Sequence, residues 1–145
     1  MKRKKTAVVC LLLLLSLGFA IPTYAEEIKQ VDEAVGISPL WQHIVRIDAN
    51  LVINNGRATM DGSVIANPGT TGIIVNVALD RVNTNGTLTR ITSFNNLTSS
   101  GNIWAWGGNW MVATGHTYRM TMTVTAFRNG GSETVIFSSW DVRAN

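Results

Sequence analysis

The chain has 145 residues, with twelve Lys and Arg, nine Asp and Glu, and a formal net charge of +3. Four of the basic residues lie among the first five positions, so residues 26–145 hold eight basic against nine acidic residues and a formal charge of −1. Nucleic-acid binding needs clustered cations that neutralise phosphates, and here the arginines are scattered singly. We therefore expect no nucleic-acid partner.

A cleavable secretory signal peptide is predicted for residues 1–25. Basic residues precede an apolar run from Ala7 to Ala20, and Thr23-Tyr24-Ala25 offers small residues at the −3 and −1 positions of a cleavage site. The mature chain is then expected to be secreted, either free in the medium or held non-covalently at the cell surface.

The predicted mature chain has no cysteine, because the only one, Cys10, lies inside the apolar run. A domain of about 110 residues can be held by its core alone, without a disulfide. No second apolar stretch reaches the roughly 18 residues that span a bilayer, so we expect no transmembrane segment in the mature chain.

The mature chain is predicted to consist of a flexible leader over residues 26–37 and one domain over 38–145. The leader is rich in charge, whereas from Trp41 onward the hydrophobic period is two, which predicts a strand with one buried face. Asn55-Gly56 can supply the positive φ angles of a tight turn into a hairpin partner over 58–66. The inward positions of the first strand are Trp41, Val45, Ile47, Ala49, Leu51 and Ile53, and Trp41 is assigned a structural role.

A third strand is predicted over residues 72–82, with inward side chains between Ile73 and Leu79. A turn leads into residues 87–94, whose apolar residues follow no single parity; an edge strand or a bulged segment accounts for such a pattern. The polar residues 95–101 are predicted to form a loop.

The clearest alternation covers residues 118–126, and Asn129-Gly130-Gly131 turns the chain into a last strand from Glu133 to Trp140. The mature region thus contains about seven short strands, regular turn signals and no helical periodicity. Each sheet has one apolar face that another sheet must cover. We therefore predict an all-β fold, a single antiparallel β-sandwich of immunoglobulin-like type without a disulfide.

The segment Gly115 to Met122 resembles the entry into strand F of fibronectin type III and other immunoglobulin-like domains. The resemblance implies that Tyr118 folds back to hydrogen-bond the preceding corner, which gives it a structural role. A second resemblance rests on four segments, Ser38-Pro39-Leu40-Trp41, the strand Ile73 to Leu79, Tyr118-Arg119 and Ser132-Glu133-Thr134-Val135. Through these segments the mature region is similar to a family of small secreted Gram-positive bacterial proteins with no assigned function. That similarity implies a secreted sandwich and transfers no catalytic residue.

The tryptophans of residues 103–112 are the candidate binding site. Trp104 and Trp106 share a parity, which on a strand places two indoles on one face about 7 Å apart. Successive sugar rings can stack on such a pair, with Trp110 closing one end. Alternatively the tryptophans fill the core, where large aromatic residues usually lie. The sequence leaves both interpretations open.

No catalytic or metal-binding motif is recognisable in the mature region. His43 and His116 lie in different elements, so we expect no metal and no cofactor. His43 is expected to be partly buried and hydrogen-bonded, and His116 to be exposed. The carboxylates lie isolated on outward parities, where solvated surface charge is the default. They are Asp48, Asp61, Asp80, Glu133 and Asp141. We therefore expect that the protein is not an enzyme.

The leading functional hypothesis is a secreted binding module that recognises a cell-envelope or extracellular polysaccharide through Trp104, Trp106 and Trp110. The first alternative is a structural or adhesive domain that binds a protein partner through a strand edge or loop, which predicts buried tryptophans. The second alternative is a small bacteriocin-like effector. The mature charge near −1 and the absence of amphipathic helical patterns argue against that alternative.

Overall fold

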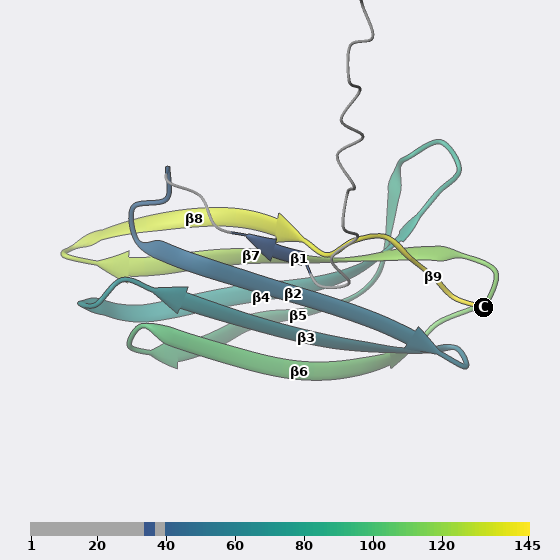
Figure 1. Ribbon diagram of the computed structural model, residues 1–145, viewed down its shortest axis with the longest axis horizontal. Coiled ribbons are helices and arrows are strands. Elements are labelled where there is room, and N and C mark those ends of the chain that lie inside the picture. Colours follow the sequence, from purple (N-terminus) through teal and green to yellow (C-terminus); the bar gives the residue numbers. More distant parts are fainter. Residues whose placement is uncertain (1–33, 37–39) are drawn as a thin grey trace, which may run out of the picture. The chain divides into compact units, whose positions relative to one another are not determined.

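The computed structural model describes residues 34–36 and 40–145, in which the chain forms nine strands and no helix. Two antiparallel sheets pack face to face, so the predicted all-β sandwich is confirmed (Figure 1). Sheet A contains β1 (Ala34–Gly36), β2 (Ile44–Asn54), β3 (Arg57–Ala66) and β6 (Ile103–Met111). Sheet B contains β4 (Thr70–Val82), β5 (Leu88–Ser100), β7 (Thr117–Arg128), β8 (Gly131–Ser138) and β9 (Val142–Arg143). The described residues include no helix long and apolar enough to cross a membrane.

The strand order, which the sequence left open, is that of an immunoglobulin-like Greek key. Sheet A has the order β1-β2-β3-β6, and sheet B has the order β5-β4-β7-β8, with β9 also pairing with β7. Among the long strands, the first, second and fifth therefore lie together, and so do the third, sixth and seventh, as in immunoglobulin domains. The fourth long strand, β5, pairs with the third.

The β2–β3 hairpin follows the predicted pattern except at its start. Asn55 and Gly56 both have positive φ angles, 50° and 71°, as the two-residue turn requires. In the hairpin partner predicted over 58–66, every second residue from Ala58 to Ala66 is buried, as one inward face requires. The expectation that Val45 points inward is wrong, since it is 43% exposed. A register shift between Ile44 and Arg46 turns Ile44 into the core instead.

Strand β5 corrects the expected loop over residues 95–101, because the strand continues to Ser100. Two register shifts in its pairing with β4 mark β-bulges. Each bulge adds a residue, so Ile91, Phe94 and Leu97 reach the core three residues apart instead of two. The irregular parity thus belongs to a strand that is both bulged and at the edge of sheet B.

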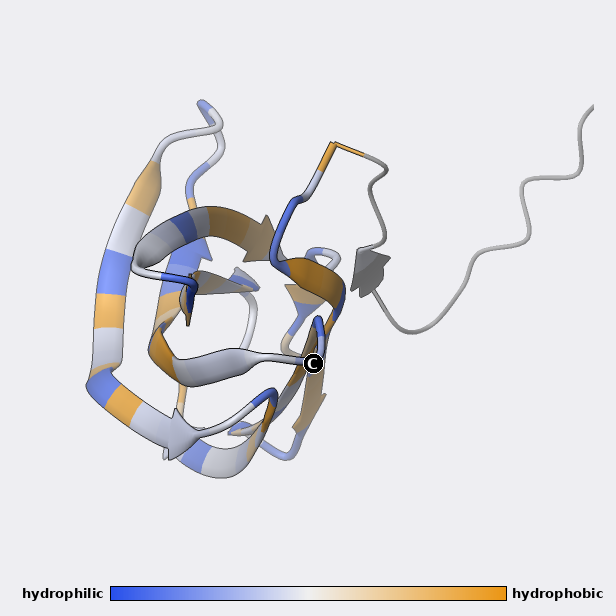
Figure 2. Ribbon diagram, turned by 90° about the vertical axis from the view of Figure 1, so that its left-hand side faces the viewer, coloured by the Kyte–Doolittle hydropathy of each residue, from blue (hydrophilic) through white to orange (hydrophobic). Residues whose placement is uncertain are grey.

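The core lies between the two sheets, and Figure 2 shows the alternation of hydrophobic and hydrophilic residues along the strands that build it. From β7 it receives Tyr118, Met120, Met122, Val124 and Ala126. Tyr118 makes the contact that the resemblance implies, because its hydroxyl donates a hydrogen bond of 2.8 Å to the Ala113 carbonyl. Trp41 packs half-buried against the same core.

Strand β1 lies inside the segment interpreted as a leader. Its three residues pair with Ile47–Ala49 of β2. Gly36 is buried, and a Cβ there would lie 2.4 Å from Cε2 of Phe137 and 2.9 Å from Cη2 of Trp41. The sandwich therefore begins before residue 38, whereas the predicted signal peptide over 1–25 lies outside the described residues.

Candidate functional site

The three tryptophans of the predicted site lie on β6 at different depths. Trp104 is 3% exposed and belongs to the core, so it offers no surface to a ligand. Trp106 is half-buried, and Trp110 is 44% exposed. An open platform of Trp104 and Trp106 is therefore not present, because sheet B already covers Trp104.

Trp106 and Trp110 pack on Phe94 of β5. The ring centroids of Phe94 and Trp106 are 4.9 Å apart with an interplanar angle of 50°. Those of Phe94 and Trp110 are 6.4 Å apart and nearly perpendicular, which is a favourable edge-to-face arrangement. The Trp106 indole lies over Gly108, where a Cβ would be 2.3 Å from its Cη2 atom. This aromatic cluster, Phe94, Trp106 and Trp110, closes the sandwich between β5 and β6.

The pairing of β6 with β3 fixes the direction of its backbone groups. The two strands pair over nine residues without a register shift. In such a pair, residues bonded to the neighbour alternate with residues whose N–H and C=O point away. At the two ends of the pairing, Ala66 N–H donates to the Asn102 carbonyl, and Val112 N–H donates to the Gly56 carbonyl, both at 2.8 Å. The even-numbered residues of β6 therefore bond to β3.

The odd-numbered residues of β6 direct their backbone groups away from β3. They are Ile103, Ala105, Gly107, Asn109 and Met111. The Ile103 carbonyl accepts a 2.7 Å hydrogen bond from Ser99 Oγ, which agrees with this direction. Among residues 34–36 and 40–145, no strand pairs with β6 on this side, which lies at the lower margin of Figure 1. We call this row of backbone groups the β6 edge.

The β6 edge lacks the features that usually protect a strand edge from further pairing. Ile103–Met111 contains no charged residue and no proline. On the outer face of sheet A, Ile103 is 62% exposed and Met111 is 68% exposed. The other edges of the described sheets differ. In sheet A, β1 has three residues, and β2, which β1 pairs with only over Ile47–Ala49, carries two charged residues and a register shift at its start. In sheet B, β5 is bulged twice, β8 carries the charged Glu133, and β9 has two residues.

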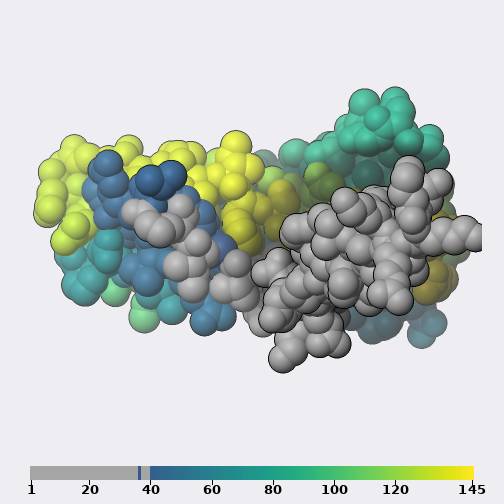
Figure 3. All heavy atoms as spheres, turned by 45° about the horizontal axis from the view of Figure 1, so that its top comes forward, coloured from purple at the N-terminus to yellow at the C-terminus, as the bar shows by residue number. Residues whose placement is uncertain are grey.

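Glu133 connects sheet B to the backbone that leads into β2. Its Oε1 accepts the N–H of Gln42 at 2.7 Å, and its Oε2 accepts those of His43 at 2.7 Å and Ile44 at 3.0 Å. Burial acts to raise the pKa of Glu133, but the three backbone N–H groups together outweigh it, so the pKa lies below its ordinary value. Figure 3 shows the blue start of β2 beside the yellow-green β7–β8 hairpin. The expectation of a solvated carboxylate is wrong here.

Asp80 is the second carboxylate that departs from expectation. It is buried on the central strand β4, and its Oδ1 accepts a short hydrogen bond from Nε of Arg90 on β5. Desolvation makes an unpaired carboxylate costly at such a position, so the arginine stabilises it. Asp80 and Glu133 therefore each have a structural partner.

The histidines and the remaining carboxylates form no recognisable reactive group. His43 is half-buried as expected, but its buried Nδ1 has no hydrogen-bond partner among the described residues. His116 is exposed, as expected. Asp48 pairs with Arg46 and Ser63, and Asp141 pairs with Arg119. The described part of the chain places no three His, Cys, Asp or Glu side chains close enough to hold a metal ion.

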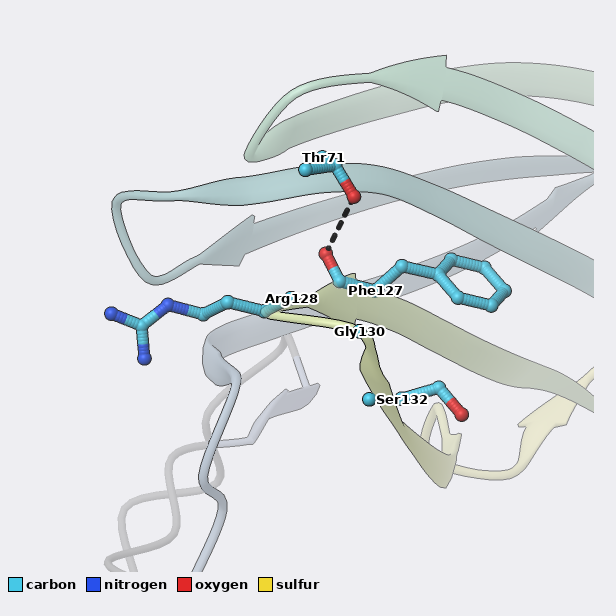
Figure 4. A pocket seen from close by; sticks show the side chains of 6 residues that line it. Thr71, Phe127, Arg128, Gly130 and Ser132 are labelled. Atoms are coloured by element: carbon cyan, nitrogen blue, oxygen red, sulfur yellow. Dashed lines mark hydrogen bonds between the residues drawn. The ribbon is translucent and has the colours of Figure 1, made fainter.

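A shallow depression of about 560 Å³ lies where β4 begins and the β7–β8 hairpin turns (Figure 4). The hydroxyl of Thr71 donates to the Phe127 carbonyl at 3.2 Å, and Nε of Arg128 donates to the Pro68 carbonyl at 3.1 Å. Figure 4 shows Arg128 extending away from Phe127 and Ser132. Ligand pockets usually combine enclosure with convergent polar groups. This depression lacks that convergence, so the β6 edge and the adjoining aromatic cluster remain the candidate site.

No protein-family model matches the chain, and neither does any curated protein. Among solved structures, the chain is similar to the solution structure of R. palustris CsgH, with 15% sequence identity and a TM-score of 0.37. The match covers 64% of this chain and 88% of the other. A likeness at this level carries no inference about function.

Proposed function

We propose that the chain is a secreted, non-catalytic binding domain that takes up an extended protein segment as an additional strand along the β6 edge. The observation that supports this proposal is the contrast between β6 and the other edges. Nine regularly paired residues without charge or proline lie at one edge, while the remaining described edges are short, bulged or charged. In strand addition, main-chain hydrogen bonds supply affinity and alternate side chains supply specificity.

The chemistry of the edge fits a segment with alternating apolar side chains. The backbone of such a segment bonds to Ala105, Gly107 and Asn109, whose outer-face side chains are small or polar. Its alternate side chains on that face cover the exposed apolar groups of Ile103 and Met111. Removing these two side chains from water contributes the hydrophobic part of the affinity.

A selection of displayed random ten-residue peptides against the immobilised chain tests the proposal. Enriched peptides should alternate apolar and polar residues. They should lose binding to an Ala105→Pro/Asn109→Pro variant, which removes two edge N–H groups without removing a donor to β3. The matched control is Ala105→Ser/Asn109→Ser, which keeps both N–H groups and should retain binding. No enriched peptide, or equal binding to the proline and serine variants, contradicts strand addition.

A polysaccharide ligand is the second candidate, because Trp110 is 44% exposed beside Phe94 and one indole face can stack on a sugar ring. Co-sedimentation with purified cell walls and insoluble polysaccharides tests it. Binding that disappears in Trp110→Ala and persists in the double proline variant favours the polysaccharide. Absence of wild-type co-sedimentation removes this candidate.

A further inference from the structure

Resting on the proposed function of the β6 edge, we propose that its protein partner is a second copy of the same chain. In this arrangement β6 pairs antiparallel with β6 of the other copy, in the register that places Gly107 opposite Gly107. The two copies are related by a twofold axis, and the two A sheets become one continuous sheet. The argument comes from the pattern of backbone and side-chain groups along β6.

The backbone groups of β6 that point away from β3 include those of Gly107 and of the residues two and four positions away on each side. The Ile103 carbonyl already accepts from Ser99 Oγ, so the pairing depends on the three central residues Ala105, Gly107 and Asn109. In the Gly107-centred register, Ala105 faces Asn109 and Ile103 faces Met111 of the other copy. Each of these pairs joins two residues whose N–H and C=O point outward, so both strands meet in hydrogen-bonding register. The three central pairs supply about six hydrogen bonds, at two for each pair.

The side chains of β6 are compatible with the same register. On the outer face it places Ile103 opposite Met111 of the other copy, and these are two of the most exposed apolar side chains. On the inner face it places Trp106 opposite Gly108, a large residue against one without a side chain. Because Ile103–Met111 contains no charge, symmetric pairing brings no like charges together.

Gly107 itself supports close approach of another backbone. The need for glycine at position 108 arises within the chain, because the Trp106 indole lies against it. A Cβ at Gly107 would instead lie 3.1 Å from Asp61 Oδ1, the end of an exposed side chain, and at an ordinary contact distance of 3.9 Å from the Met60 carbonyl oxygen. A glycine inside a regular strand weakens it and often marks a site where another backbone comes close. The centre of the proposed pairing is such a site.

The association is expected to be weak and concentration-dependent. Edge-to-edge contact of one strand from each copy lies at the small end of protein interfaces, so we expect a dissociation constant on the order of 10 μM. Sedimentation velocity of the chain, expressed from its complete sequence and purified as the host processes it, should show monomer and dimer exchanging across this range.

Charge substitution at the edge tests the register directly. Ala105→Lys/Asn109→Lys places lysine opposite lysine twice in each dimer and should weaken association about tenfold or more. Ala105→Lys/Asn109→Glu places lysine opposite glutamate twice and should restore it. Both positions are exposed, so both variants should fold, and circular dichroism checks this. The control is Ile136→Lys on the outer face of sheet B, which should leave association unchanged.

A cysteine at the centre gives an independent measurement. Opposed residues in a hydrogen-bonded antiparallel pair have Cα atoms about 5.5 Å apart, within the range that a disulfide spans. Under oxidation, Gly107→Cys on a Cys10→Ser background should form a covalent dimer, whereas Thr59→Cys on β3 should not.

A chain that stays monomeric up to about 500 μM overturns the self-pairing, since this is far above the expected dissociation constant. In that case peptide binding that depends on the β6 edge still supports the proposed function. If the two charge variants weaken dimerisation equally, the proposed register is also overturned.

Discussion

Replacing Glu133 by glutamine isolates the effect of one carboxylate that joins the two sheets. Its oxygens accept three backbone N–H groups, at 2.7, 2.7 and 3.0 Å. Glutamine has nearly the same shape, but its NH2 group cannot accept, so Gln42 N–H loses its partner. The N–H groups of His43 and Ile44 keep an oxygen acceptor, but this oxygen is no longer charged, so the two hydrogen bonds become weaker.

The expected loss of stability at neutral pH follows from these bonds. A hydrogen bond to a charged group contributes about 1.5–3 kcal/mol net, and partial exposure reduces this. We therefore expect the free energy of unfolding to fall by about 2 kcal/mol in Glu133→Gln. For a domain of about 110 residues, this lowers the melting temperature by about 8 °C.

The pH dependence of this loss separates charge from packing. Because the pKa of folded Glu133 is lowered from 4.5, the ionised carboxylate stabilises the fold above the unfolded-state pKa. That stabilisation disappears as the pH falls through the folded-state pKa. Thermal melts should therefore show a difference between wild type and Glu133→Gln that is constant at about pH 6–8 and shrinks below about pH 4.5. The control, Asp61→Asn, removes an exposed carboxylate from β3. A difference as large at pH 3 as at pH 7, or none at pH 7, refutes the reasoning.

Three further variants test the core and the tryptophan environments. Tyr118→Phe removes the corner hydrogen bond and should lower the free energy of unfolding by about 1 kcal/mol in chemical denaturation, while the fold persists. Gly62→Ala should cost about 1–3 kcal/mol in the same assay, because a Cβ there lies 3.0 Å from a methionine sulfur on β7; an unchanged midpoint argues against tight packing between the sheets. Replacing Trp110 and Trp140 together by Phe should shift the fluorescence emission to shorter wavelength and reduce acrylamide quenching, since both are exposed and Trp104 is buried. Unchanged quenching contradicts the placement of these side chains.

The parts of the fold that follow from sequence are those set by local alternation. The turn at Asn55-Gly56, the inward residues of β3 and the long run of β7 all depend on neighbours within a few positions. The bulges were harder to place because each one adds a residue and converts a period of two into three. For this reason Val45 exchanges its inward position with Ile44, and residues 95–100 read as a loop although they belong to β5.

The position and exposure of the candidate site depend on the strand topology, which cannot be predicted from the local alternation of residues. Trp104 and Trp106 share a parity as predicted, and Trp110 follows the same parity, but the exposure of the three side chains depends on how far sheet B covers β6. The partner of Asp80 lies on another strand about 10 residues away in sequence, and those of Glu133 lie at the start of β2, about 90 residues away. A solvated surface was therefore the natural default for both carboxylates. The lack of charge along β6 was visible in the sequence. Its position at a sheet edge was not, because it follows from the pairing of β3 with β6.

Each sheet depends on one pairing between strands that are distant in sequence, β3 with β6 and β4 with β7. The hairpins β2–β3, β4–β5 and β7–β8 are local, and isolated hairpins form in about 1–10 μs. The two distant pairings must first close long loops, and sandwiches dominated by such contacts fold in milliseconds to seconds. During that interval β6 is a nascent, uncharged strand with neither edge covered. The rate at which β3 captures it therefore determines how long newly made chains are exposed to aggregation.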